Sequence, residues 1–238
     1  MLKELYISNN EFKGPLQPYF SNFSFLRELD INIDFNLASL TYLEYLDFEG
    51  NQFEVPISFA PFSNHSNLKF IYGNGNKVIL DSYSTLETCV PKFQLQVLSL
   101  SSRTETNFLA IPSFLHYQYN LTYLDFTGCK LGGEFPNWLL ENKTKMTNLV
   151  LNNCSFTQFQ LPSHLHLHLA EMDVSDNAIT GLKIPSNNIS SIFPNFKLLD
   201  MSTNAIHGSI PPEFGQMNLL QSLDLSNNII CLEKFLMS

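Results

Sequence analysis

The sequence contains few charged residues, a single tryptophan and no long apolar run. Charged residues make up 15% of the 238 residues, and 22 acidic residues outnumber 13 basic ones, which gives a net charge of −9 at pH 7. An acidic chain of this kind is repelled by nucleic acids and by anionic membrane surfaces. No stretch of about 18 apolar residues offers a transmembrane helix. No basic start followed by an apolar run indicates a signal peptide.

Cysteine is also scarce, and the four cysteines do not form a convincing disulfide framework. Cys129 and Cys154 occupy equivalent places in neighbouring copies of a repeat, which favours buried free thiols. A bridge between them stays open on distance, because neighbouring copies lie close together. Cys89 and Cys231 are separated by too many copies to pair.

One short phrase recurs ten times along the chain. The clearest copy is LQSLDLSNN from Leu220, and LTYLDFTGC from Leu121 and LAEMDVSDN from Leu169 are close to it. The first, fourth and sixth residues of each copy are apolar, with Gly73 as the one exception. A period of roughly 20–29 residues with this pattern is the signature of leucine-rich repeats. The copies begin at residues 2, 26, 43, 68, 95, 121, 146, 169, 196 and 220.

Alternation of apolar and polar residues within each copy predicts a short strand with one face inward and one face toward solvent. A single copy cannot bury its apolar face, so the copies must stack. The sequence therefore predicts an α/β-type leucine-rich repeat solenoid of about ten repeats. We expect it to be curved, with a single parallel β-sheet on the concave face and 3₁₀ or irregular segments on the convex side. The repeat domain is expected over residues 1–230, followed by an irregular tail at 231–238, with no capping unit at either end.

The ninth residue of each copy is usually small and polar. Such a side chain can turn inward and satisfy backbone groups where the chain leaves the strand. This structural ladder is expected to comprise Asn10, Asn51, Asn76, Cys129, Cys154, Asn177, Asn204 and Asn228.

The second half of several copies indicates which class of leucine-rich repeat the chain resembles. LGGEFP from Leu131, ITGLKIP from Ile179 and IHGSIP from Ile206 resemble the plant-specific repeat LxxLxLxxNxLxGxIP. The run from Asn120 to Asn228, with FPNWLLENKT and LPSHLHLHL, is similar to the ectodomains of plant receptor-like proteins. The resemblance implies a longer parent protein with a signal peptide, caps, a transmembrane helix and a short cytoplasmic tail, and we expect none of these four parts within the present sequence. It implies a location at the extracellular face of the plasma membrane or in the cell wall space.

The candidate binding site is the solvent-facing side of the predicted sheet. The third and fifth residues of each copy form two columns, which are aromatic and apolar in the middle copies and acidic toward the ends. Exposed tyrosine and phenylalanine in one patch favour contact with a protein or a peptide; simple packing across neighbouring strands is the alternative. The candidate ligand-binding residues are Tyr45, Phe70, Tyr72, Val97, Tyr123, Asp125, Asp173 and Asp200.

Six N-x-S/T sequons indicate a secretory route if they carry glycans. Five are expected on the convex side or just before a strand, where glycans would leave the concave face open: Asn22, Asn64, Asn120, Asn142 and Asn188. The sixth, Asn153, is expected beside a strand.

Three features were weighed as catalytic, metal or phosphate sites and interpreted structurally. His164, His166 and His168 alternate and would share one face of an extended segment, but no carboxylate or cysteine stands at ligand spacing. The recurring aspartates at the fifth position are a scaffold feature rather than paired acid–base carboxylates. Residues 73–76, GNGN, are too short for a phosphate loop and predict a local bulge. We therefore expect no enzyme activity, no metal and no cofactor.

Together these observations favour a ligand-binding or co-receptor-binding ectodomain fragment of a plant receptor-like protein, acting in defence or developmental signalling. The resemblance implies a peptide or protein ligand and a membrane receptor kinase as partners. The alternative is a secreted inhibitor of a cell-wall-degrading enzyme, similar to polygalacturonase-inhibiting proteins. An intracellular adaptor is disfavoured by the GxIP phrases and the sequons.

Overall fold

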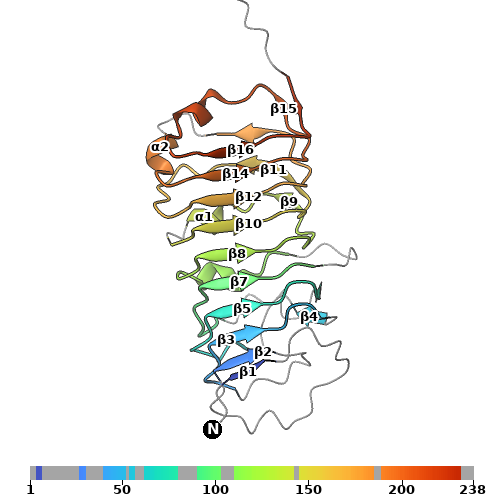
Figure 1. Ribbon diagram of the computed structural model, residues 1–238, viewed down its shortest axis with the longest axis vertical. Helices are drawn as coiled ribbons and strands as arrows, with labels where there is room; N and C mark the ends of the chain where they lie inside the picture. Colours follow the sequence, from blue (N-terminus) through green and yellow to red (C-terminus); the bar gives the residue numbers. More distant parts are fainter. Residues whose placement is uncertain are drawn as a thin grey trace, which may run out of the picture. The chain divides into compact units, whose positions relative to one another are not determined.

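The computed structural model describes residues 4–6, 27–30, 40–51, 54–56, 62–79, 90–102, 110–141, 145–184 and 189–231. The chain divides into two compact units, Met1–Cys129 (unit 1) and Lys130–Ser238 (unit 2). Each unit is built on a parallel sheet of three-residue strands, and the described segments between them hold short strands and single helical turns (Figure 1). Within the described ranges, no helix has the length and apolar character needed to cross a membrane.

In unit 1, successive copies of the repeat contribute successive parallel strands. Each strand covers the third to fifth residues of its copy, and equivalent residues pair without a register shift. The strands, in sheet order, are β1 (Glu4–Tyr6), β2 (Glu28–Asp30), β3 (Tyr45–Asp47), β5 (Phe70–Tyr72), β7 (Val97–Ser99) and β8 (Tyr123–Asp125). A second parallel pair joins β4 (Glu54–Pro56) to β6 (Lys77–Ile79), and η3 (Ser113–Tyr117) is a 3₁₀ turn.

Unit 2 repeats this plan. Its main parallel strands are β10 (Asn148–Val150), β12 (Glu171–Asp173), β14 (Leu198–Asp200) and β16 (Ser222–Asp224). The LxGxIP-like half of the copies forms a second sheet of β9 (Gly133–Glu134), β11 (Phe156–Gln160) and β13 (Leu182–Lys183), and a pair of β15 (His207–Gly208) and β17 (Ile229–Ile230). The short helices are α1 (Trp138–Glu141), α2 (Ile189–Ile192) and η4 (Pro212–Gln216). Parallel sheets with little helix confirm the predicted leucine-rich repeat fold.

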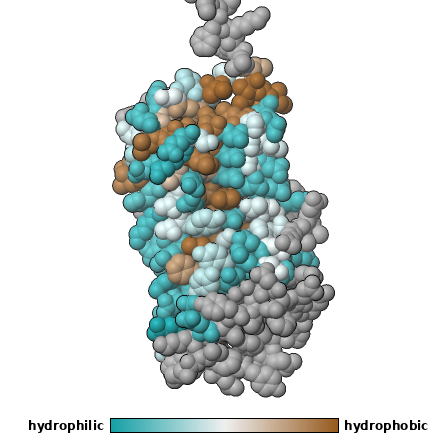
Figure 2. All heavy atoms as spheres, in the orientation of Figure 1, coloured by the Kyte–Doolittle hydropathy of each residue, from teal (hydrophilic) through white to brown (hydrophobic). Residues whose placement is uncertain are grey.

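The apolar residues of the repeat form the core. In the copies that begin at residues 43, 95, 121, 169 and 196, the first, fourth and sixth side chains are buried, and Leu46, Leu98 and Leu124 have no exposed surface. In the last copy, by contrast, Leu220, Leu223 and Leu225 are only half-buried. Figure 2 shows hydrophobic residues gathered toward the end of unit 2 that carries β15 to β17. Exposed apolar residues of unit 2 include Leu198, Ile210, Leu219 and Ile229.

Gly73, the exception to the apolar pattern, does not mark a bulge, so that prediction is wrong. The ladder runs through it without a shift: the Phe48 amide donates to the Tyr72 carbonyl at 2.9 Å, and the Gly73 amide to the Ser99 carbonyl at 2.8 Å. A Cβ atom on Gly73 would lie 2.3 Å from Cε2 of Phe48 and 2.8 Å from a methyl carbon of Leu100. The large ring of Phe48 therefore fills the space that a side chain at residue 73 would need.

Asparagines at the ninth position hold consecutive copies together through their side-chain amides. Asn204 Nδ2 lies 3.1 Å from the Val174 carbonyl of the preceding copy and 3.1 Å from the Met201 carbonyl of its own copy, while its Oδ1 accepts from the Ile179 amide at 3.0 Å. Asn177 bonds in the same way to the preceding Leu151 carbonyl and Cys154 amide. Each asparagine thus serves the copy before it as well as its own.

The other ladder positions vary in how much they contribute. Asn228 repeats the pattern of Asn204, donating to the Met201 carbonyl of the preceding copy. Asn76 donates to the Phe48 carbonyl of the preceding copy, and Asn51 to the Phe48 carbonyl of its own. At the cysteine positions, the thiol of Cys129 donates to the Leu100 carbonyl, and that of Cys154 to the Asn152 carbonyl. Asn10 lies outside the described residues.

Candidate functional site

The solvent-facing side of the main strands carries the third, fifth and seventh residues of each copy, and we call it the strand face. The fourth residue points inward, which gives the burial pattern of a half-exposed, a buried and a half-exposed residue in β3 and β5. In unit 1 the register places Tyr45 beside Phe70, Phe70 beside Val97, and Val97 beside Tyr123. Six of the eight candidate ligand-binding residues lie on this part of the strand face.

Aromatic side chains meet at the centre of this region. The Tyr45 ring lies 6.1 Å from the Phe70 ring and 5.3 Å from the Tyr72 ring, measured between centroids, and both pairs are tilted. All three side chains remain half-exposed. The rings therefore pack across strands and also present an apolar surface to solvent.

A chain of polar side chains runs beside the rings. Asn74 Nδ2 donates to Glu49 Oε1 at 2.6 Å and to Ser99 Oγ at 2.8 Å, and Asn74 Oδ1 accepts from the Ser101 amide at 2.8 Å. Ser99 Oγ lies 3.1 Å from Asp125 Oδ2, to which it can donate. These bonds cross four copies of the repeat, so they fix the positions of the two carboxylates, Glu49 and Asp125.

The carboxylates give this region a negative potential. Burial, followed by the nearby Asp47 carboxylate, raises the pKa of Tyr45 and Tyr72 above the ordinary tyrosine value. Burial, again followed by Asp47, raises the pKa of Glu49. Each shift reports that further negative charge is disfavoured here. A cation placed over the rings would face their π-systems beside the Asp47 carboxylate, which is the second cause of each shift after burial.

The aspartates at the fifth position of each copy also have a structural role. One carboxylate oxygen accepts from the backbone amide two residues ahead, at 2.9 Å from Asp47 to Glu49 and at 2.8 Å from Asp125 to Thr127. Such bonds close the turn after each strand. Asp224 makes the same bond with Ser226, which lowers the pKa of Asp224. The second oxygen of Asp125 accepts from Ser99 Oγ, and that of Asp47 lies 3.4 Å from the Tyr45 hydroxyl.

In unit 2 the strand face is more polar. Asp173 and Asp200 lie beside one another on β12 and β14, and each accepts from the amide and the hydroxyl of a serine two residues ahead. Beside them, Leu198 is exposed. Thus two of the candidate residues stand together in unit 2, and the six others in unit 1.

The remaining candidates fall in different surroundings. Asn64 is exposed and Asn120 half-buried, whereas Asn22, Asn142 and Asn188 lie outside the described residues. Cys129 and Cys154 are buried free thiols and Cys231 is exposed; Cys89 is not described.

The three histidines do not share one face, so that expectation is wrong. His164 and His168 are exposed, whereas His166 is buried and stacks on Phe193 at 5.4 Å between ring centroids. Within the described part of the chain, no group of three histidine, cysteine, aspartate or glutamate residues is placed to hold a metal ion.

Four residues of the site, Asp47, Ser99, Glu49 and Asn74, were not among the sequence candidates. Glu49 and Asn74 occupy the seventh position of their copies and are tied into the polar chain. Strand alternation could have identified Glu49 and Asn74, because the seventh residue alternates with the third and fifth and so belongs to the same face.

Comparisons with known proteins agree with the leucine-rich repeat pattern. The Leucine Rich Repeat family profile matches residues 1–23, 120–142 and 195–217. Cuscuta receptor 1 of Solanum lycopersicum is 39% identical over 262 aligned residues, which cover 95% of this chain and 23% of that receptor. Receptor-like protein 14 of Arabidopsis thaliana is 37% identical over 174 residues, which cover 73% of this chain and 17% of that protein. The chain therefore spans less than a quarter of the length of these curated relatives.

A solved structure shows the same fold. The Arabidopsis receptor kinase HAESA, in complex with the peptide hormone IDA and the co-receptor SERK1, matches with a TM-score of 0.67 at 24% identity. The match covers 96% of this chain and 42% of that chain.

Proposed function

Because this chain is a leucine-rich repeat member of the plant receptor-like protein family, we propose that it is part of an extracellular ligand-binding or co-receptor-binding surface. It acts by recognition, without catalysis, and signalling passes to a membrane receptor kinase. The plant relatives support this role, and the location at the plasma membrane or in the cell wall space follows from it. The inhibitor alternative is not favoured, because these relatives are receptor-like proteins.

The observation that carries the proposal is the mixed patch on the strand face of unit 1, formed by Tyr45, Phe70, Tyr72, Glu49 and Asp125. Its rings are half-exposed, although tyrosine and phenylalanine bury large areas when a partner covers them. Rigid aromatic side chains of this kind supply much of the affinity at protein interfaces at low entropic cost. The patch is therefore suited to an apolar anchor of a peptide or a protein loop.

The charge beside the rings selects the type of ligand. Glu49, Asp47 and Asp125 make the surroundings negative, and after burial the Asp47 carboxylate is the next cause of the raised pKa of Tyr45, Tyr72 and Glu49. A ligand with a lysine or arginine next to an apolar residue would satisfy both parts of the patch. Asp173 and Asp200 of unit 2 would tune the association rate and its dependence on salt.

A library of short synthetic peptides, with each position scanned through all residue types, tests the proposal. We expect the bound peptides to be enriched in basic residues beside apolar ones. Tyr45→Ala and Tyr72→Ala should weaken binding of the selected peptides by roughly tenfold or more, in the range of interface anchors.

Tyr119→Ala provides the matched control, because Tyr119 is an exposed tyrosine outside the strands of unit 1. Tyr119→Ala should leave binding unchanged. If the selected peptides bind the Tyr45 and Tyr72 variants as tightly as the parent chain, the strand face of unit 1 is not the binding surface.

A further inference from the structure

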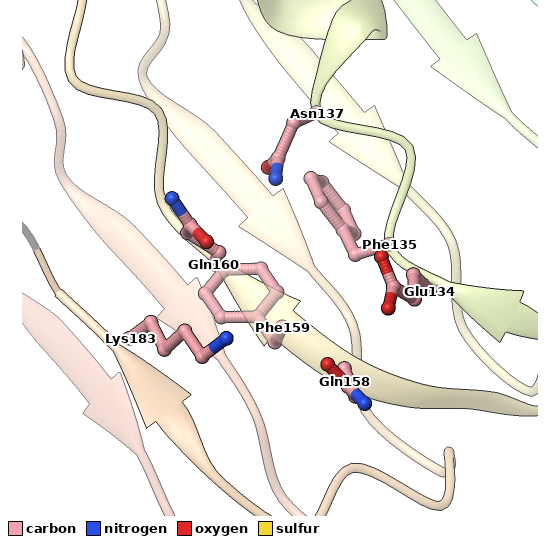
Figure 3. Close-up of a pocket in the computed structure, with 7 residues that line it drawn as sticks. All are labelled: Glu134, Phe135, Asn137, Gln158, Phe159, Gln160 and Lys183. Atoms are coloured by element: carbon pink, nitrogen blue, oxygen red, sulfur yellow. The ribbon is translucent and has the colours of Figure 1, made fainter.

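A second candidate site lies on the smaller sheet of unit 2, formed by β9, β11 and β13. A hollow opens there, and Figure 3 shows the side chains that surround it. The hollow is lined by Glu134, Phe135, Asn137, Gln158, Phe159, Gln160 and Lys183. None of these residues belongs to the main strands of unit 2, so this hollow is separate from the strand face.

Strand pairing sets the polar side chains in order. Gln158 of β11 pairs with Glu134 of β9, and Gln160 of β11 pairs with Lys183 of β13. A carboxylate therefore stands at one end of the hollow and an ammonium group at the other, with two carboxamides between them (Figure 3). Among the residues that the structure describes, neither Glu134 nor Lys183 forms an ion pair.

Asn137 adds a hydrogen-bond acceptor that lacks a partner. Its Oδ1 atom is buried and accepts no hydrogen bond from any described residue. Buried polar atoms are nearly always hydrogen-bonded in native proteins, and leaving one without a partner is costly. A ligand hydroxyl that donates to this oxygen would remove the cost.

The hollow has an apolar floor and a limited size. The Phe135 and Phe159 rings meet edge to face at 4.9 Å and are buried. The small part of the rings that faces the hollow can make van der Waals contact with C–H groups of a ligand. The cavity volume of about 70 Å³ is well below that of sites for drug-sized ligands, which hold roughly 300–1,000 Å³. This volume equals that of about two water molecules, so one edge of a small unit can enter from the open side, but an extended peptide cannot.

From this arrangement we propose that the hollow binds a single neutral sugar residue, such as the terminal residue of a glycan. Each sugar hydroxyl both donates and accepts, which matches a lining with carboxamides, a carboxylate and an ammonium group. The charges of Glu134 and Lys183 balance, so the site favours a ligand without net charge. The alternating hydroxyl and C–H surfaces of a pyranose fit the polar rim and the aromatic floor.

Saturation-transfer NMR on the whole chain tests the proposal with four probes: the methyl glycosides of glucose, xylose and mannose, and the zwitterion glycine betaine. At least one glycoside should receive saturation, with weak affinity in the millimolar range. Gln160→Leu and Lys183→Met should each lower that signal at least fivefold. The matched controls are Gln216→Leu and Lys197→Met, because both residues are exposed and lie outside the hollow.

Circular dichroism of each variant separates loss of binding from loss of fold. All four positions are on the surface, so we expect the spectra to be unchanged. The proposal is overturned if no glycoside binds, if glycine betaine binds in their place, or if the folded Gln160 and Lys183 variants retain the full signal. The outcome is independent of the peptide experiment on unit 1.

Discussion

Replacing Asn204 with alanine should remove one step of the asparagine ladder. The substitution takes away the two N–H groups shared among the Val174, Met201 and Ser202 carbonyls and the acceptor for the Ile179 amide. Two N–H groups and one oxygen correspond to three hydrogen bonds, each contributing a net of about 0.5–1.5 kcal/mol, so we expect a loss of about 3 kcal/mol. For a chain of this size the thermal midpoint should fall by roughly 6–12 °C.

Urea denaturation followed by circular dichroism measures this loss, and two further variants show its origin. Asn148→Ala is the control, because Asn148 makes an exposed side-chain bond to Glu171 in the same unit and should cost less than about 0.5 kcal/mol. Asn204→Cys should fall between the two, since cysteine at this position can still donate to a carbonyl, as Cys129 does. If Asn204→Ala and Asn148→Ala unfold at the same urea concentration, the ladder does not carry the stability that the geometry implies.

Two other predictions concern packing and pH. Gly73→Ala should destabilise unit 1 by about 1–3 kcal/mol because its new methyl group overlaps the Phe48 ring. The double variant with Phe48→Leu should lose less stability than the two single variants together. Additive losses in a double-mutant cycle would contradict this. Burial, followed by the charge of His164, lowers the pKa of His166 below 6.5, so the folded chain binds this proton less readily than the unfolded chain. The free energy of unfolding should therefore decrease as the pH falls below about 6.5. Denaturation curves at several pH values should show that His166→Phe weakens this dependence. The control His168→Phe, at an exposed site, should leave the dependence unchanged.

Much of the fold could be predicted because every copy of the repeat has nearly the same pattern of apolar and polar residues. Apolar first, fourth and sixth residues mark the inward side of every strand, and the parallel register follows once the copies stack. The position where this reasoning failed, Gly73, depends on a distant residue. Nothing in the local sequence shows that Phe48, from the preceding copy, occupies its space.

The candidate site was predictable in outline and not in detail. Strand alternation was enough to place Tyr45, Phe70 and Tyr72 on one surface. It could not show that Asn74 bridges Glu49 and Ser99, because these bonds depend on side-chain positions in three different copies. His166 was misjudged for a related reason: its burial is set by Phe193, which is remote in sequence.

The asparagine ladder also gives the chain a direction. Asn177, Asn204 and Asn228 each bond to backbone groups of the copy before them, so a copy is completed by its successor and not by its predecessor. A gene duplication that inserts a whole copy brings its own asparagine, so the copy before it still receives these hydrogen bonds. After deletion of a whole copy, the asparagine of the next copy can bond to the copy that now precedes it. As far as the ladder is concerned, repeat number can therefore change in evolution without a new asparagine having to arise, and the cost falls on side-chain contacts between copies such as that of Phe48 with Gly73.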